Sequence, residues 1–253
     1  MIKKTRIIRS KNILYFIVVC LLFSYLLIYF FDIRENWKGT HKIWYEIFKE
    51  RGPIENLQWF VLGLFSIVSA FISGNLWYQK KFHESRFWLL LSILGMIMVI
   101  EDTGNISHIF RSYVIRLELP VPAFIPDERI IVYAIYGLVA LYPMFIYHKH
   151  KLSFPGPFRF IFVGYLIYGF ISFSSASQDR GVIDWYQPAG EFLIDLIGSG
   201  KLYYTLPETH WAYEIVGYLF MDTVVEESIE LIAAAFLLTG AFSFVEGYLC
   251  NKK

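Results

Sequence analysis

The sequence has few cysteines, few charges and none of the short motifs that mark soluble catalytic domains. Its two cysteines, Cys20 and Cys250, lie in or beside hydrophobic segments near opposite ends of the chain, with no CxxC pair. We therefore interpret them as inert thiols. Charged residues make up only 18% of the chain and the formal net charge is +1, which indicates no nucleic-acid partner. A glycine-rich phosphate loop and an HExxH motif are both missing, so nucleotide hydrolysis and a zinc-protease site have no support.

Apolar sequence is what the chain has in abundance. Of its 253 residues, 56% are hydrophobic and 19% are aromatic, and the mean hydropathy is +0.47. A membrane-spanning helix needs about 20 apolar residues to cross about 30 Å of hydrocarbon. We therefore predict an all-α, polytopic transmembrane helix bundle of about six spans, which forms a single domain over residues 1–253. The spans are expected at about residues 13–31, 57–78, 85–102, 130–147, 158–176 and 215–249.

Two of these runs have unusual lengths. The run over 85–102 reaches spanning length if its helix continues through Glu101 and Asp102 or begins near Ser85. The last run is about 35 residues, or about 50 Å as a helix, so it must tilt, project from the bilayer or break. The sequence alone therefore does not fix where the helix over 85–102 begins and ends, or how the last run crosses the membrane.

The loops on one side of the membrane contain short apolar segments. Residues 41–50 carry apolar side chains at helical spacing, which predicts either an amphipathic helix at the membrane interface or a helix packed on the bundle. Residues 192–197 are too short to cross and favour a re-entrant or surface helix, so we expect no seventh span. We predict that both are short interfacial helices in the outer loops.

The orientation follows from the distribution of lysine and arginine. The first run is too long for a signal-peptide core and lacks a small-residue cleavage site after it, so we expect a retained anchor. With the N-terminus placed inside, the inner segments hold thirteen basic residues and two acidic ones. Cytoplasmic segments carry such an excess of positive charge. We predict a multi-pass protein of the cell (inner, cytoplasmic) membrane with both termini in the cytoplasm.

Carboxylates inside or beside the apolar runs are the candidate functional residues, because ionisable groups at membrane depth are costly. Glu101 and Asp102 close the third span. Asp222, Glu226 and Glu230 follow one another at intervals of four residues and share one helix face in the final run. Given the alternating directions of the spans, both groups are expected at the outer side of the membrane. Glu227 in the final run and Glu55 at the start of the second span fall at the same level.

A carboxylate cluster of this kind must share protons, pair with a cation or bind a metal. Oxygen ligands suit calcium, magnesium or manganese, and a histidine would also suit zinc or iron. We therefore consider one divalent metal ion as a candidate cofactor. Its candidate ligands are Glu101, Asp102, His108, Glu226, Glu227 and Glu230, with Glu55 and Asp222 as further contributors. A purely structural interpretation stays open, in which these acids cap helices, face water, or pair with Arg111, Arg116 or Arg180.

Three short motifs resemble a group of uncharacterised bacterial multi-pass inner-membrane proteins. They are the Gly-Pro-hydrophobic-Glu entry at 52–55, the acidic pair at 101–102, and the Glu-Glu-Ser-x-Glu-Leu segment at 226–231. In that group the acidic pair is followed by a tryptophan-containing sequence, which this chain replaces with residues 103–108. The resemblance implies a membrane protein of the same type and implies no activity.

Two classes of function follow from these residues. In the first, the acidic cluster binds a cation or a proton, for transport, sensing or assembly with a partner. In the second, the protein is a metal-dependent hydrolase or transferase that acts on a lipid or lipid-linked substrate. A transporter should show a polar path inward past Glu230, whereas an enzyme should show a lateral groove toward the lipid. The expected partners are membrane lipids and a membrane protein or a second copy of the chain, with no nucleic acid and no nucleotide.

Overall fold

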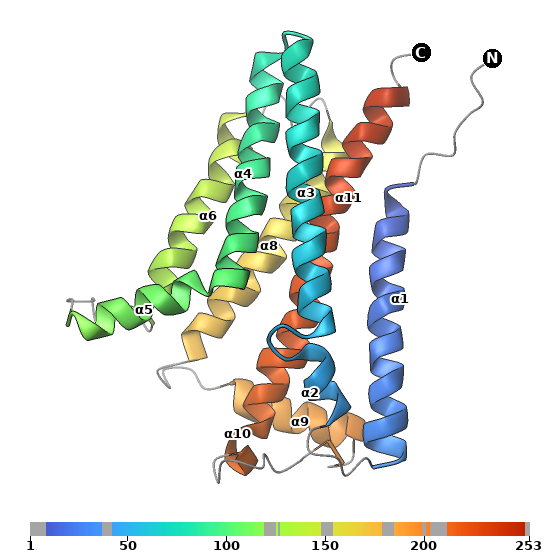
Figure 1. The fold of residues 1–253 in the computed structure, drawn as a ribbon, viewed down its shortest axis with the longest axis vertical. Coiled ribbons are helices and arrows are strands. Elements are labelled where there is room, and N and C mark those ends of the chain that lie inside the picture. The colour runs from blue at the N-terminus through green and yellow to red at the C-terminus, as the bar shows by residue number, and fades with distance from the viewer. Residues whose placement is uncertain are drawn as a thin grey trace.

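The computed structural model describes residues 9–36, 42–118, 125, 127–147, 154–178, 185–198, 201–202 and 212–250. Over these residues every regular element is a helix (Figure 1). The long helices are α1 (Lys11–Ile28), α3 (Pro53–Tyr78), α4 (Phe82–Gly104), α6 (Arg129–Ile146), α8 (Pro155–Gln178) and α11 (Glu226–Cys250). The short ones are α2 (Ile43–Phe48), α5 (Ile106–Arg116), α9 (Tyr186–Gly198) and α10 (Ala212–Leu219), and two π-helical turns, η1 (Tyr29–Arg34) and η2 (Phe220–Val225), extend α1 and precede α11.

Six helical stretches in the described part of the chain are long and apolar enough to cross a membrane. They are Lys11–Arg34, Ile43–Tyr78, Phe82–Gly104, Arg129–Ile146, Pro155–Gln178 and Val216–Tyr248. Each coincides with one of the six predicted spans. The prediction of an all-α, polytopic bundle is therefore confirmed, and the protein is a membrane-spanning helical protein.

The structure settles the two runs of unusual length. Helix α4 both begins before Ser85 and continues past Asp102, and it ends where Asn105 adopts a left-handed conformation with φ 49°. Asparagine is one of the few residues that take this conformation at a helix end. The final run forms one continuous helical stretch, Val216–Tyr248, in which η2 is a wider π-helical turn between α10 and α11. This turn ends immediately before Glu226.

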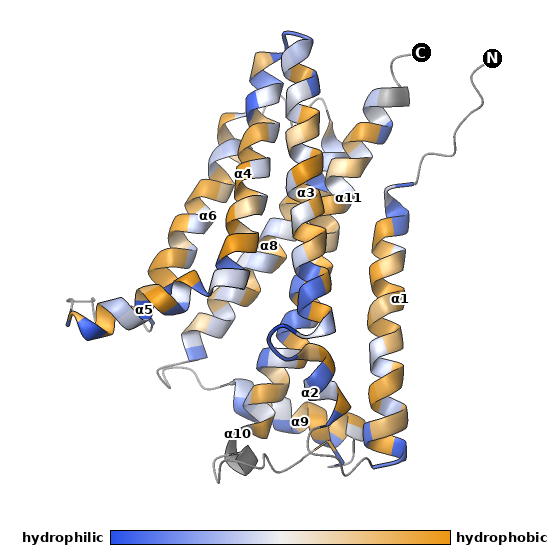
Figure 2. Ribbon diagram, in the orientation of Figure 1, coloured by the Kyte–Doolittle hydropathy of each residue, from blue (hydrophilic) through white to orange (hydrophobic). Residues whose placement is uncertain are grey.

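The bundle has two unlike ends (Figure 1). The turn between α3 and α4, the start of α1 and the end of α11 lie at one end, and α2, α9 and α10 lie at the other, which we call the acidic end. Hydrophilic residues gather where α3 and α4 approach the acidic end, whereas the middle of each long helix is mostly hydrophobic (Figure 2). Many aromatic and aliphatic side chains are exposed on the outer surfaces of α1, α4, α6 and α8, as expected for contact with lipid.

Helix α2 packs on the bundle. Its Trp44 and Phe48 are fully buried, and the backbone N–H groups of Ile43 and Trp44 donate to the Asp32 carboxylate at 2.9 and 2.8 Å. Asp32 itself has no exposed surface. Of the two interpretations of residues 41–50, the packed helix is thus the one the structure shows.

Helix α11 forms the centre of the bundle and packs against α8, α3 and α1. Its buried stretch is rich in small residues, including Ala233, Ala234 and Ala235, which let neighbouring backbones approach closely. At Gly240 a Cβ atom would lie 2.5 Å from Ile161 and 2.9 Å from the carbonyl oxygen of Pro157 on α8. The close approach of α8 and α11 holds the polar residues of both helices in register at the acidic end.

Candidate functional site

An acidic cavity of about 190 Å³ lies among the long helices toward the acidic end of the bundle. Its walls come from α2, α3, α4, α5, α6, α8, α10, η2 and α11, so it joins segments far apart in the sequence. Eight carboxylates line it: Glu50, Glu55, Glu101, Asp102, Asp222, Glu226, Glu227 and Glu230. The basic side chains in the lining are Arg129 and His108. Negative charge therefore dominates this cavity.

Every residue proposed as a site residue from the sequence lies in this lining. The structure brings together Glu101 and Asp102 of α4, Glu226, Glu227 and Glu230 of α11, and His108, Glu55 and Asp222. Two further acidic residues, Glu191 and Asp195, lie on α9 outside the lining. The candidate ion-pair partner at position 180 lies outside the described residues.

Gln58 on α3 links the two acidic helices, α4 and α11, behind the residues that line the cavity. Its side-chain amide nitrogen donates to Asp102 Oδ2 at 2.9 Å and to Glu230 Oε2 at 2.8 Å. The hydroxyl of Tyr168 on α8 donates to the same Asp102 oxygen at 2.7 Å. Gln58 is 1% exposed, so these bonds form away from water. Neutral donors from α3 and α8 thus hold Asp102 of α4 and Glu230 of α11 close together.

Tyr186 on α9 supports Glu226 from the side of the cavity. The buried Tyr186 hydroxyl donates to Glu226 Oε2 at 3.2 Å. Burial raises the pKa of Tyr186 above its ordinary value, and the nearby negative charge of Glu226 raises it further. The phenol therefore stays protonated and remains a donor to the carboxylate at any physiological pH.

His108 is engaged with an arginine. Its Nε2 lies 3.1 Å from Arg129 Nη1, and because a guanidinium group only donates, Nε2 is the acceptor. Arg129 Nε in turn lies 3.0 Å from Asp127 Oδ1, and Arg111 Nε lies 3.4 Å from Asp127 Oδ2. Asp127 has no exposed surface. The exposed histidine therefore contacts the edge of an ionic cluster, centred on the buried Asp127 and Arg129, that joins α5 to α6.

In the part of the chain that the structure describes, the candidate metal ligands are not gathered around one point. Within the part of the chain that the structure describes, no three His, Cys, Asp or Glu side chains are placed to hold one. The carboxylates are spread around a roomy cavity, Asp102 and Glu230 are already bridged by Gln58, and His108 Nε2 faces a guanidinium group. Metal ligands must converge to within about 2.0–2.6 Å of one point.

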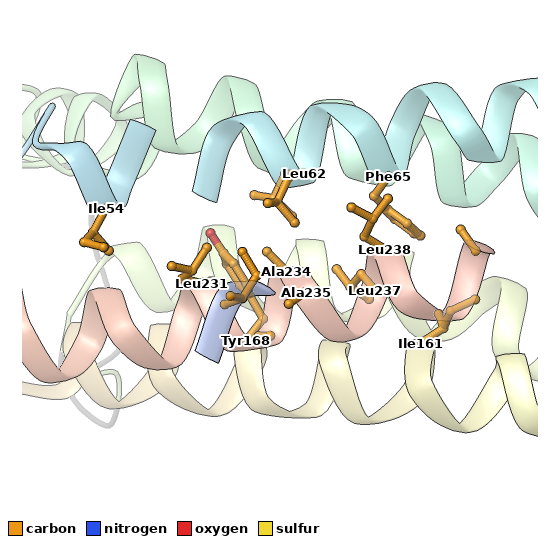
Figure 3. Close-up of a cluster of buried hydrophobic side chains, with 14 of the residues drawn as sticks. Ile54, Leu62, Phe65, Ile161, Tyr168, Leu231, Ala234, Ala235, Leu237 and Leu238 are labelled. Atoms are coloured by element: carbon orange, nitrogen blue, oxygen red, sulfur yellow. The ribbon is translucent and has the colours of Figure 1, made fainter. Parts of the chain in front are cut away.

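On the side of the cavity facing away from the acidic end, α11 becomes apolar. Leu231, Ala234, Ala235 and Leu238 of α11 lie beside Leu62 and Phe65 of α3 and Ile161 of α8 (Figure 3). All of these side chains are at most 4% exposed. Close-packed apolar side chains leave little room for water. The packing directly after Glu230 is thus apolar at these positions.

Gln58, Tyr168 and Tyr186 are the polar partners that the sequence did not single out. Gln58 lies one helical turn after Glu55, on the same face of α3, and this spacing was the one signal available for it. Tyr168 and Tyr186 are single tyrosines in a chain with 18 of them, so neither stands out before the helices are assembled. No protein-family model, curated protein or solved structure matches this chain in the comparisons with known proteins.

Proposed function

We propose that this membrane protein binds a cation in the acidic cavity and acts as a sensing or assembly component. The observation that carries the proposal is the lining of the cavity, in which eight carboxylates gather around one space. The arginine in that lining already pairs with the buried Asp127. Like charges gathered in a region of low dielectric attract positively charged ligands strongly.

A binding role has more support than a transport role. A cation that entered the cavity would meet the apolar packing around Leu231, Leu62 and Phe65 (Figure 3). Moving a charge through such packing without polar partners is costly. The metal-dependent hydrolase or transferase has less support than cation binding, because the side chains do not converge as metal ligands within the described residues.

The excess of basic residues in the segments opposite to the cavity supports an orientation in which the cavity faces the outer side of the cell membrane. We test this with single cysteines in a background lacking Cys20 and Cys250. Glu84→Cys near the turn between α3 and α4 should react with a membrane-impermeant maleimide only after cell lysis, whereas Ser112→Cys on α5 should react in intact cells. The reverse pattern would overturn the orientation.

Cation binding is tested by thermal unfolding of the detergent-purified protein with sodium, calcium or methylammonium chloride. A ligand that binds the folded state stabilises it by about 2.7 kcal/mol at 100 times its dissociation constant. At least one cation should raise the Tm of the wild type by several degrees and leave the Glu226→Gln/Glu230→Gln variant unchanged. Glu46→Gln, which removes an exposed carboxylate paired with Lys49 outside the cavity, is the control. Equal responses of the wild type and the double variant would refute the proposal.

A further inference from the structure

A second, apolar cavity adjoins the acidic one. It has a volume of about 250 Å³ and lies between α4, α6 and α8. Its lining is mainly aliphatic and aromatic, with Leu94, Ile97 and Met98 from α4, Ile130, Ala134, Gly137 and Ala140 from α6, and Tyr165, Gly169 and Phe173 from α8. Together the two cavities fall within the range of roughly 300–1,000 Å³ that is usual for small-molecule sites.

The two cavities share part of their walls. Glu101, Tyr133 and Ser172, one residue from each of α4, α6 and α8, line both. Ala134, Gly137 and Phe173 in the apolar lining are exposed at the surface of the bundle, within spans that would face hydrocarbon. A negatively charged compartment therefore lies directly beside an apolar compartment, and the apolar one has a lateral opening toward the lipid.

Two buried oxygen atoms at the acidic compartment lack a hydrogen-bond donor within the described part of the chain. One is Oε1 of Gln58, whose amide nitrogen bridges the cavity-lining Asp102 and Glu230. The other is Oε2 of Glu227, which is itself in the lining. Buried acceptors without a donor are costly. They call for a ligand that brings N–H donors as well as positive charge.

We propose that the two cavities together bind a single-chain amphiphile with a protonated primary amine as its head group. The amine lies among the carboxylates and donates to Glu227 Oε2, and the alkyl chain lies between α4, α6 and α8. This inference rests on the proposed cation binding and names its ligand class. An amphiphile with a phosphate head group is disfavoured, because eight carboxylates would repel it.

The test uses tetradecylamine with a photoreactive diazirine in its chain and the protein reconstituted in phosphatidylcholine nanodiscs. Labelled peptides are identified by mass spectrometry. We expect saturable labelling of α6 and α8 that excess tetradecylamine abolishes and excess tetradecanol, which has the same chain without the charge, leaves in place. Equal competition by the amine and the alcohol would show mere lipid contact and overturn the inference.

Two variants separate the head-group contacts from the chain contacts. Glu226→Gln/Glu230→Gln should weaken amine binding at least tenfold. Gly137→Phe should fill the apolar cavity, since a Cβ at this position meets no atom within 4 Å, and should also weaken binding of the long amine about tenfold. Gly63→Phe on α3 is the matched control. A Cβ at this position also meets no atom within 4 Å, but Gly63 lines neither of the two cavities. This variant should bind the amine as the wild type does.

Methylammonium distinguishes failure of this inference from failure of the proposed function. If methylammonium stabilises the wild type and Gly137→Phe equally while the long amine leaves the α6 and α8 peptides unlabelled, the cavity binds cations but not amphiphiles. If neither the short nor the long amine binds, both proposals are wrong. Labelling that is lost in Gly137→Phe and retained in Gly63→Phe supports the combined site even where the double carboxylate variant fails to fold.

Discussion

The two parts of helix α11 are held in place by different interactions. Its first turn, from Glu226 to Glu230, carries carboxylates that accept hydrogen bonds from Tyr186 and Gln58. The stretch from Leu231 to Phe244 has no ionisable residue, and it is held by close packing against α3 and α8. One continuous helix thus combines a polar region that depends on specific partners with an apolar region that depends on shape. Substitutions in the two regions should differ in size and in their response to pH.

The largest effect is expected from Gln58→Leu. The substitution removes the donor between Asp102 and Glu230 and leaves two buried carboxylates facing each other, which we expect to cost about 3 kcal/mol at neutral pH. The loss should be smaller at pH 4 than at pH 8, because protons added at low pH relieve the repulsion between the carboxylates. Thermal unfolding followed by circular dichroism measures the difference.

The control for this substitution is Asn75→Leu, an exposed position on the same helix. It should change the free energy of unfolding little at either pH. Two results would contradict this expectation: Gln58→Leu loses no more stability than the control, or it loses the same amount at both pH values. Either result would show that the hydrogen bonds from Gln58 to Asp102 and Glu230 do not stabilise the fold.

Gly240→Leu tests the apolar region of α11. The new side chain would collide with Ile161 and with the backbone of Pro157, and overpacking of this kind costs about 2 kcal/mol. Gly247→Leu on the same helix, where a Cβ meets no atom within 4 Å, should unfold at nearly the wild-type temperature. The difference between the two variants should be independent of pH, in contrast to Gln58→Leu. Equal unfolding temperatures would argue against the close contact of α8 and α11.

Tyr186→Phe should have a smaller effect, about 1 kcal/mol, because it removes one hydrogen bond to Glu226. The folded-state pKa of Tyr186 is raised above the ordinary value of 10.0, so this tyrosine stabilises the fold below that pH and its contribution falls as the pH rises above it. The difference between the wild type and the variant should therefore be constant from pH 6 to pH 9 and shrink above pH 10. Tyr78→Phe, at a side chain that is 90% exposed, is the control and should show neither effect.

Glu46→Gln is expected to have the smallest effect. Glu46 and Lys49 form an ion pair at 2.5 Å with both side chains 39% exposed, and such surface pairs contribute less than about 0.5 kcal/mol. The change in unfolding temperature should disappear in 0.5 M salt, since salt screens exposed charges. A change as large as that of Gln58→Leu would contradict the distinction between carboxylates inside and outside the cavity.

The spans and the acidic residues could be predicted because both depend on local sequence. A run of about 20 apolar residues crosses the membrane whatever its neighbours are, and a carboxylate inside such a run is conspicuous. The alternating directions of the spans were also enough to bring Glu101 and Glu230 to one end of the bundle. The predicted metal ligation of these residues stays a prediction.

Which helix faces meet is determined only by the tertiary structure, and these contacts determine which side chains line the cavity and which hydrogen bonds they form. Gln58 became the bridge between two carboxylates because α3 lies against α11 and beside α4, and His108 became a partner of Arg129 because α5 folds against α6. The apolar compartment beside the acidic one likewise exists only where α4, α6 and α8 come together. Hydropathy predicts which side chains are removed from water. Hydrogen-bond partners and cavities depend instead on how the helices are rotated and spaced relative to one another, and no single segment of sequence determines that.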